Sequence, residues 1–146
     1  MSDQLLTHLV LPIANETDAT VTCTELRPYI DSTVETITVV HVIEKAGGYL
    51  DKAPLEAREQ QAEKVFSIIE EEFRDGPTIN NELRYGTDVV DEIIATADEH
   101  DATAIVFTPQ SSRWITNLLA ENIAQRLITE SHCPVVSFPM MDPADE

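Results

Sequence analysis

Short apolar runs alternate with amphipathic segments along the whole chain, and this alternation constrains the fold more than any other feature. Residues 6–13, 36–43 and 103–108 are continuous apolar runs of the kind found in strands buried on both faces of a sheet. Residues 78–85 instead alternate between apolar and polar side chains, which is typical of a half-exposed strand near a sheet edge. Residues 134–138 form the last run. The pattern therefore predicts five strands.

Helical periodicity fills the intervals between these runs. Apolar residues recur at helical spacing in residues 55–74, 88–100 and 115–130, so each of these segments is predicted to be a helix. The segment 16–31 is rich in threonine and contains Pro28, which breaks a helix interior. A helix in that segment is expected to be short or to end just before this proline.

Strand–helix alternation of this kind favours an α/β fold, in which one open parallel sheet carries helices on both faces. We assign a single domain to residues 3–139 and expect residues 140–146 to be a flexible acidic tail. Open parallel sheets bind ligands at the carboxyl ends of their strands, where the strand order reverses. The relevant strand ends in this chain are residues 13–15, 42–44 and 107–109.

The charge of the chain excludes several classes of partner. Twenty-seven acidic residues against nine basic ones give a net charge of −18 and a pI near 4.3. Such a surface repels nucleic acids and anionic membranes, so neither is expected as a partner. Abundant acid with few lysines is typical of haloarchaeal cytoplasmic proteins, whose charges are screened by concentrated salt. A basic protein partner is the alternative explanation.

The sequence contains no signal-peptide pattern and no apolar run of the ~20 residues that a membrane span needs, so we expect a cytoplasmic protein without stable membrane insertion. Cys23 and Cys133 suit neither a disulfide framework nor a zinc site. No two of the four histidines have the i, i+4 spacing of a helical metal site. His41 is interpreted as a packed or hydrogen-bonded strand residue. We predict no catalytic and no metal-binding residues.

Four strings in order resemble the universal stress protein family: "HLVLPIANET", "TVVHVIE", "RYGTDVVDEIIATADEHDATAIVF" and "NIAQRLITESHCPVVSF". The resemblance covers nearly the whole chain, from about residue 5 to residue 139. It implies five strands in the order 3-2-1-4-5 and a homodimer formed by antiparallel pairing of the last strand. Val135, Val136 and Phe138 are the candidate interface residues.

The resemblance also points to a nucleotide site whose motif has degenerated in this chain. Family members that bind ATP carry G-x2-G-x9-G followed by Ser or Thr after the fourth strand, and an aspartate after the first. Glycines let backbone N–H groups approach phosphates. In this sequence the aspartate position, the three glycine positions and the hydroxyl position fall on Ala14, Thr108, Ser111, Glu121 and Asn122. Val42 matches the position whose backbone meets adenine, and Arg113 is a candidate anion ligand in the same loop.

These substitutions favour a dimeric, non-catalytic regulatory module of the non-ATP-binding branch, exemplified by universal stress protein A. Trp114 is consistent with that branch, because universal stress protein A also carries a tryptophan near this place. No cofactor is expected, and the partner would be an unidentified protein. The alternatives are a sensor for ATP or AMP, a weak ATPase of the same fold, and an accessory to a membrane transporter.

Overall fold

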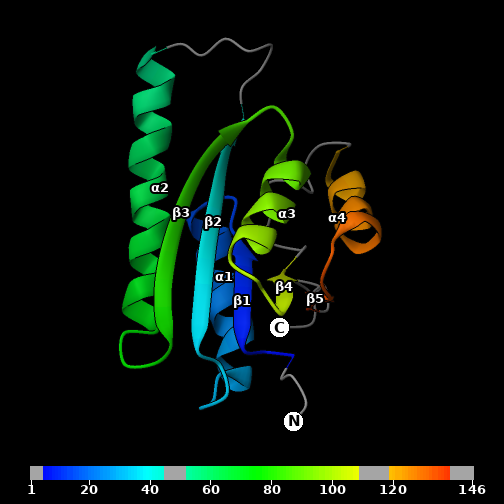
Figure 1. Ribbon diagram of the computed structural model, residues 1–146. Helices are drawn as coiled ribbons and strands as arrows, with labels where there is room; N and C mark the ends of the chain where they lie inside the picture. Colours follow the sequence, from blue (N-terminus) through cyan, green and yellow to red (C-terminus); the bar gives the residue numbers. More distant parts are fainter. Residues whose placement is uncertain (1–4, 45–51, 109–118, 139–146) are drawn as a thin grey trace, which may run out of the picture.

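The computed structural model describes residues 5–44, 52–108 and 119–138 of the chain (Figure 1). In chain order the elements are β1 (His8–Pro12), α1 (Glu16–Leu26), the 3-10 helix η1 (Arg27–Tyr29), β2 (Thr36–Glu44), α2 (Lys52–Glu72), β3 (Thr78–Gly86), α3 (Val89–Glu99), β4 (Ala104–Phe107), α4 (Leu119–Glu130) and β5 (Val135–Ser137). All five predicted strands are present. The first part of the predicted helix 115–130 lies outside the described residues.

The five strands form one sheet in the order β3-β2-β1-β4-β5, and all neighbouring strands are parallel. The predicted fold class and strand order are therefore confirmed. β3 lies at one edge and pairs with β2 over its whole length, from Thr36 opposite Thr78 to Glu44 opposite Gly86. The prediction of an edge strand at residues 78–85 is confirmed as well.

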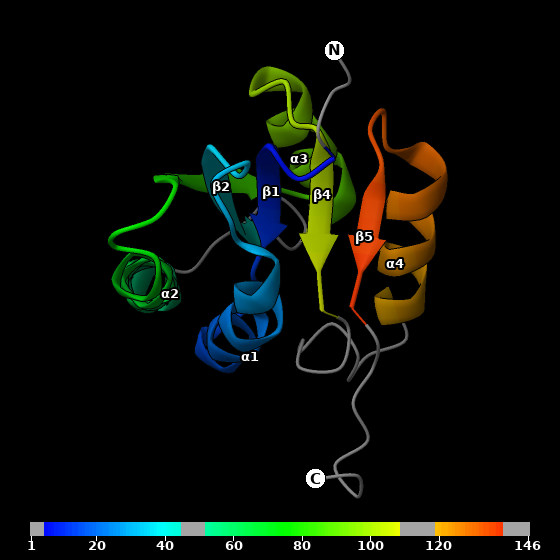
Figure 2. The same ribbon diagram turned by 90° about the horizontal axis from the view of Figure 1, so that it is seen from below.

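Helices cover both faces of the sheet, as Figure 2 shows from below. Helices α1 and α2 pack on one face over Leu9, Leu11 and Val39, and this core also takes in Phe138. Helices α3 and α4 pack on the other face over Val10, Val40 and Ile105. Alternate residues of β1 thus enter different cores, which explains why its sequence is continuously apolar. Complete burial of each such side chain stabilises the fold by roughly 1.5–3 kcal/mol.

Helix boundaries follow from local sequence signals. Helix α1 ends at Leu26, and the chain turns into η1 at the place where Pro28 cannot continue an α-helix, as predicted. Helix α2 begins at Lys52, earlier than the predicted residue 55, because Pro54 is compatible with a first helical turn. Helix α3 is capped by Asp88, whose side chain accepts the N–H of Asp91 at 3.0 Å.

Candidate functional site

The strand order reverses between β1 and β4, because β2 lies on the far side of β1 and β5 lies on the far side of β4. Helix α1 begins at the same edge, immediately after β1 (Figure 1). This is where open parallel sheets place their ligand sites. Asn15, which belongs to the predicted strand end 13–15, lies at this edge. Asp18 and Thr22, which the sequence analysis did not select, lie close to it on α1.

A buried polar cluster joins α1 to the end of β4. Asp18, Thr22 and Thr108 are each at most 2% exposed. The hydroxyls of Thr22 and Thr108 lie 2.6 Å apart, and each lies 3.3 Å from Oδ1 of Asp18. The N–H of Ala14 donates to the other carboxylate oxygen at 2.8 Å. The Asp18 carboxylate therefore ties the end of β1 to the end of β4 through hydrogen bonds.

Asn15 caps α1 through its side chain. Its Oδ1 accepts the N–H of Asp18 at 2.8 Å, which fixes the orientation of the carboxamide. The residue is 8% exposed, and its Nδ2 has no hydrogen-bond partner within the part of the chain that the structure describes. Leaving such a buried donor unpaired costs about 1–3 kcal/mol. Natural proteins retain few groups of this kind, and a ligand acceptor would remove the cost.

The electrostatics at this edge disfavour an anion. Glu16 and Asp18 both lie in the first turn of α1, where they already interact favourably with the helix dipole. A phosphate oxygen about 4 Å from a carboxylate would meet a repulsion of about 4 kcal/mol at an effective dielectric constant near 20. The described part of the site is better suited to an uncharged group or a cation.

His41 contributes a second polar atom on the same edge. The ring is 5% exposed, and its Nδ1 lies 2.8 Å from the carbonyl oxygen of Ile13. Since a carbonyl only accepts, Nδ1 carries the proton in this contact. Burial lowers the pKa of His41, which opposes the effect of the Ile13 carbonyl, so the neutral ring is favoured. Its Nε2 is then a hydrogen-bond acceptor. The interpretation of His41 as a hydrogen-bonded strand residue is confirmed.

The structure brings together only part of the predicted nucleotide site. Ala14 and Thr108 both contact Asp18. The side chain of Val42 packs on the opposite face, against the core beneath α3 and α4. Ser111, Arg113 and Trp114 lie outside the described residues, as do the side chains of Glu121 and Asn122. The assignment of these residues to a nucleotide site stays a prediction.

The sequence contains a helix-capping signal at Asn15 and Asp18. Asn15 and Asp18 have the spacing of a capping box, in which an N-cap side chain and a side chain three residues later each bind backbone N–H groups. In this chain the acid bonds the N–H of Ala14, one residue before the cap. This capping pattern could have been recognised in the sequence. The contact of Asp18 with Thr108 could not, because it depends on tertiary structure.

The predicted dimer residues lie on and just after the other edge strand, β5. Val135 and Val136 are half-buried within the chain. The ring of Phe138 is 6% exposed and stacks on Tyr29, with the ring centroids 5.5 Å apart. The side chain of Phe138 is thus packed within its own chain. Pairing with a second copy would therefore use the backbone of β5. The dimer itself stays a prediction.

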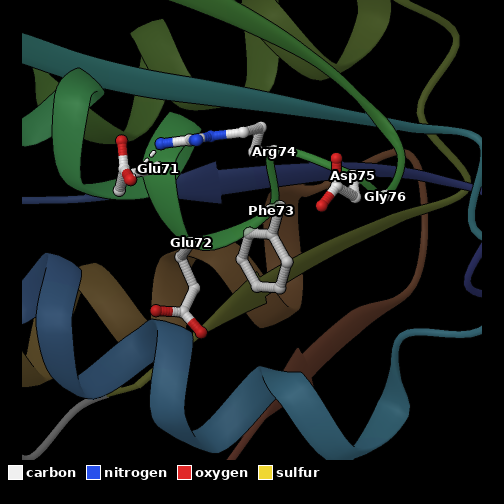
Figure 3. A pocket seen from close by; sticks show the side chains of 6 residues that line it. All are labelled: Glu71, Glu72, Phe73, Arg74, Asp75 and Gly76. Atoms are coloured by element: carbon white, nitrogen blue, oxygen red, sulfur yellow. Dashed lines mark hydrogen bonds and ion pairs between the residues drawn. The ribbon is translucent and has the colours of Figure 1, made fainter.

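A separate hollow lies far from this edge, at the C-terminal end of α2 (Figure 3). It is lined by Glu71, Glu72, Phe73, Arg74, Asp75 and Gly76. Arg74 pairs with Glu71, Glu72 pairs with Arg27, and the ring of Phe73 belongs to the core. The arginine that lines this hollow is already paired with a carboxylate, and we assign the hollow no binding role.

Two other features are absent from residues 5–44, 52–108 and 119–138. No group of three or more His, Cys, Asp or Glu side chains is arranged to hold a metal ion. No helix there is both long enough and apolar enough to span a membrane.

The sheet order and the polar edge between β1 and β4 define an open parallel α/β protein with a candidate ligand site at its switch point. The model of the universal stress protein family matches residues 30–139, and the chain belongs to this family.

Solved structures agree with this fold. Hypothetical protein MJ0577 superposes with a TM-score of 0.75 at 18% identity, over 95% of this chain and 99% of that chain. The universal stress protein from Archaeoglobus fulgidus in complex with dAMP gives a TM-score of 0.59 at 23% identity, over 93% and 100%. An Arabidopsis thaliana family protein with AMP bound gives 0.57 at 14%, over 95% and 94%. The comparison with curated proteins found no match.

Proposed function

We propose that this chain is a non-catalytic regulatory module of the universal stress protein family in which the triphosphate-binding role of the switch-point edge has been lost. It would act as a homodimer in the cytoplasm through contact with another protein. The domain would span residues 3–139, and the halophilic character of the surface would keep the dimer soluble in concentrated salt.

The buried Asp18–Thr22–Thr108 cluster carries this proposal. Thr108 matches the first glycine position of the family's ATP motif. Its side chain is buried at this place, where a glycine would leave the backbone accessible to a ligand. Its hydroxyl is engaged by Thr22 and Asp18. A glycine at this position would expose backbone N–H groups to phosphate, whereas the threonine is linked to a carboxylate that repels phosphate. The described residues therefore do not fit a triphosphate.

A nucleotide sensor is the second candidate, and one observation favours it. The buried Nδ2 of Asn15 lacks a partner among the described residues, and solved structures of the same fold were obtained as complexes with dAMP, AMP and cAMP. A ligand bound through this donor would act by changing the contacts that the dimer makes. No covalent step is implied in this role.

Calorimetric titration of the full-length protein with MgATP at high salt tests the proposal. We expect no binding tighter than a Kd of about 1 mM. The Archaeoglobus fulgidus relative titrated with dAMP in the same apparatus is the positive control, because that protein is known as a dAMP complex. Micromolar affinity of this chain for MgATP would contradict the proposal and favour the sensor.

A further inference from the structure

Strand β3 presents a long and regular edge of the sheet. It is the last strand on its side, and within the described residues no other strand pairs with its outer side. Its nine residues, Thr78–Gly86, pair with β2 one to one and without a bulge. The other edge strand, β5, has only three residues. A long edge without a bulge is a template for pairing with a further strand.

The register shows which backbone groups of β3 point outward. The N–H of Thr78 donates to the carbonyl of Glu35, next to β2, at 2.9 Å, and Thr78 lies opposite Thr36. The backbone groups of successive residues point to alternate sides of a strand, so every second residue after Thr78 bonds β2 and the residues between them point outward. The outward residues are Ile79, Asn81, Leu83 and Tyr85. This row is about 20 Å long at the usual rise of a parallel strand.

Carboxylates line both sides of this edge. On the α2 side, which Figure 1 shows running alongside β3, Asn81 donates to Glu70 at 2.7 Å. The hydroxyl of Tyr85 donates to Glu59 on the same helix. On the α3 side, three carboxylates surround Arg84, the basic residue of the strand. They belong to Glu82, Glu92 and Glu99. Five carboxylates thus lie against one guanidinium along the edge.

The charge distinguishes between the possible occupants of this edge. A second copy of the chain would bring its own acidic edge against this one, and each copy has a net charge of −18. An acidic segment of another protein would meet the same repulsion. An extended segment that carries lysine or arginine meets the opposite condition, because its backbone can bond the outward row while its cations face the carboxylates.

We propose that the β3 edge, the row of outward backbone groups from Ile79 to Tyr85, binds an extended segment rich in lysine or arginine from a partner protein, as an additional strand. This inference rests on the proposed function, in which the chain acts through contact with another protein. It names the surface and the chemistry of that partner, and it leaves β5 for the dimer. The acidic residues beside β3 would then serve recognition as well as solubility.

A seven-residue peptide of alternating lysine and valine is the probe, because its length matches the outward row. Its twin with proline in place of valine keeps the charge but cannot pair as a strand. Each peptide is titrated calorimetrically into the full-length protein, at the lowest KCl concentration at which the protein stays folded. We expect the lysine–valine peptide to bind about tenfold more tightly than its proline twin.

Amide hydrogen exchange locates the peptide on the protein. The outward N–H groups of Asn81 and Leu83 should exchange about tenfold more slowly when the lysine–valine peptide is bound. The N–H groups of Asn80 and Glu82, which face β2, should change little. These two sets alternate in one strand, so each is the control for the other. Slower exchange at β5 instead of β3 would place the peptide on the other edge and overturn the inference.

Asn81→Pro removes an outward N–H from the row and keeps the bonds to β2. We expect the affinity for the lysine–valine peptide to fall about tenfold. Asn81→Ala is the matched control, because it also loses the bond to Glu70 but retains the N–H, and its affinity should stay within about twofold of the wild type. Unchanged affinity in a folded Asn81→Pro variant overturns the inference.

The double variant Glu59→Gln and Glu70→Gln tests the contribution of charge. Each glutamine keeps an acceptor for its partner, Tyr85 or Asn81, and removes one negative charge. We expect the affinity for the lysine–valine peptide to fall about threefold. This variant and the exchange measurement decide the matter if Asn81→Pro does not fold.

The remaining outcomes separate this inference from the proposed function. Equal affinity of the two cationic peptides would show that charge alone drives binding, and it would overturn the inference. Slow exchange of Asn81 and Leu83 that increases with protein concentration in the absence of peptide would overturn it too, because a second copy would then occupy the edge. Both results leave the proposed function standing, since the MgATP titration tests it separately. Tight MgATP binding would contradict the proposed function, and the peptide measurements would still report on the β3 edge.

Discussion

At the scale of single residues, Thr108 is the position where the family's motif and this chain differ most informatively. Thr108→Val preserves shape but removes a hydroxyl that contacts Thr22 and Asp18. We expect the free energy of unfolding to fall by about 1–2 kcal/mol, measured by urea denaturation at constant high salt. Thr24→Val is the control, because the exposed Thr24 hydroxyl donates to the Thr20 carbonyl of its own helix; its effect on the free energy of unfolding should stay within about 0.5 kcal/mol. Equal losses in both variants would show that the cluster contributes nothing.

His41 predicts a pH dependence of stability. Burial holds the pKa of His41 in the folded chain below its ordinary value of 6.5. At a pH between the folded-state pKa and 6.5, the unfolded chain therefore binds a proton that the folded chain does not. The contribution of His41 to the free energy of unfolding should be constant above about pH 6.5 and should decrease as the pH falls below it. Urea denaturation of the wild type and of His41→Asn from pH 7.5 to 5 tests this. A difference between the two proteins that does not change with pH would contradict the assignment.

At the scale of elements, Arg84 joins β3 to α3. Its side chain is 18% exposed and contacts the carboxylates of Glu92 at 2.8 Å, Glu99 at 3.1 Å and Glu82 at 3.2 Å. Hydrogen bonding to Glu92, the largest effect, and to Glu99 raises the pKa of Arg84. Glu92 also packs over Gly86, where an added Cβ would clash with the Glu92 carboxylate.

Arg84→Met should therefore destabilise the fold by about 1–3 kcal/mol at low salt, because three carboxylates lose their shared cation. The loss should shrink in molar salt, which screens their mutual repulsion. Arg74→Met removes an exposed pair with Glu71 and should cost about 0–1 kcal/mol. Denaturation midpoints at two salt concentrations check both values, and a loss for Arg74→Met as large as that for Arg84→Met would be inconsistent with this network.

Alternation in residues 78–85 was enough to predict an edge strand, but the sequence did not show what covers its polar side chains. Arg84 belongs to the alternating polar set, yet helix α3 shields it through Glu92 and Glu99. Those partners are 8 and 15 residues away, and the pairing depends on how the chain turns between β3 and α3. Periodicity reports which side chains share a face and does not report their partners.

The short edge strand β5 predicts how the dimer can be disrupted. Pro134 accepts from Ile105 and Phe138 donates to Phe107, so the backbone groups of Val135 and Ser137 point away from β4. Ser137→Pro removes an outward N–H while keeping the bonds to β4. We expect the wild type to be a dimer of the 16.3 kDa chain and Ser137→Pro to shift it toward monomer, with Ser137→Ala unchanged. Light scattering after size exclusion measures this, and a dimeric Ser137→Pro would place the interface elsewhere.

At the scale of the whole molecule, the sheet order agreed with expectation because the five predicted strands and the strings that resemble the family pointed to the same topology. The candidate site was predicted less completely. Ala14 and Thr108 were selected from the family pattern and Asn15 only as part of a strand end, whereas Asp18 and Thr22 were missed. Their roles arise from contacts such as that between Thr22 and Thr108. These two residues are 86 positions apart in the sequence, and the pairing of β1 with β4 brings them together.

The net charge of −18 predicts that stability depends strongly on salt. Raising the ionic strength from 0.1 M to 1 M shortens the Debye length from about 10 Å to about 3 Å, which screens repulsion between neighbouring acids. The free energy of unfolding, measured with urea, should therefore rise over this range of KCl. A value that stays constant or falls would contradict a halophilic role for the acidic surface.

The loss of triphosphate binding is the central claim, and the most direct test is to ask what the protein carries from the cell. The chain should be purified natively at high salt, denatured, and its released small molecules identified by mass spectrometry. We expect that no ATP is released. Stoichiometric ATP would contradict it and would mean that a phosphate site forms despite the Asp18–Thr22–Thr108 cluster.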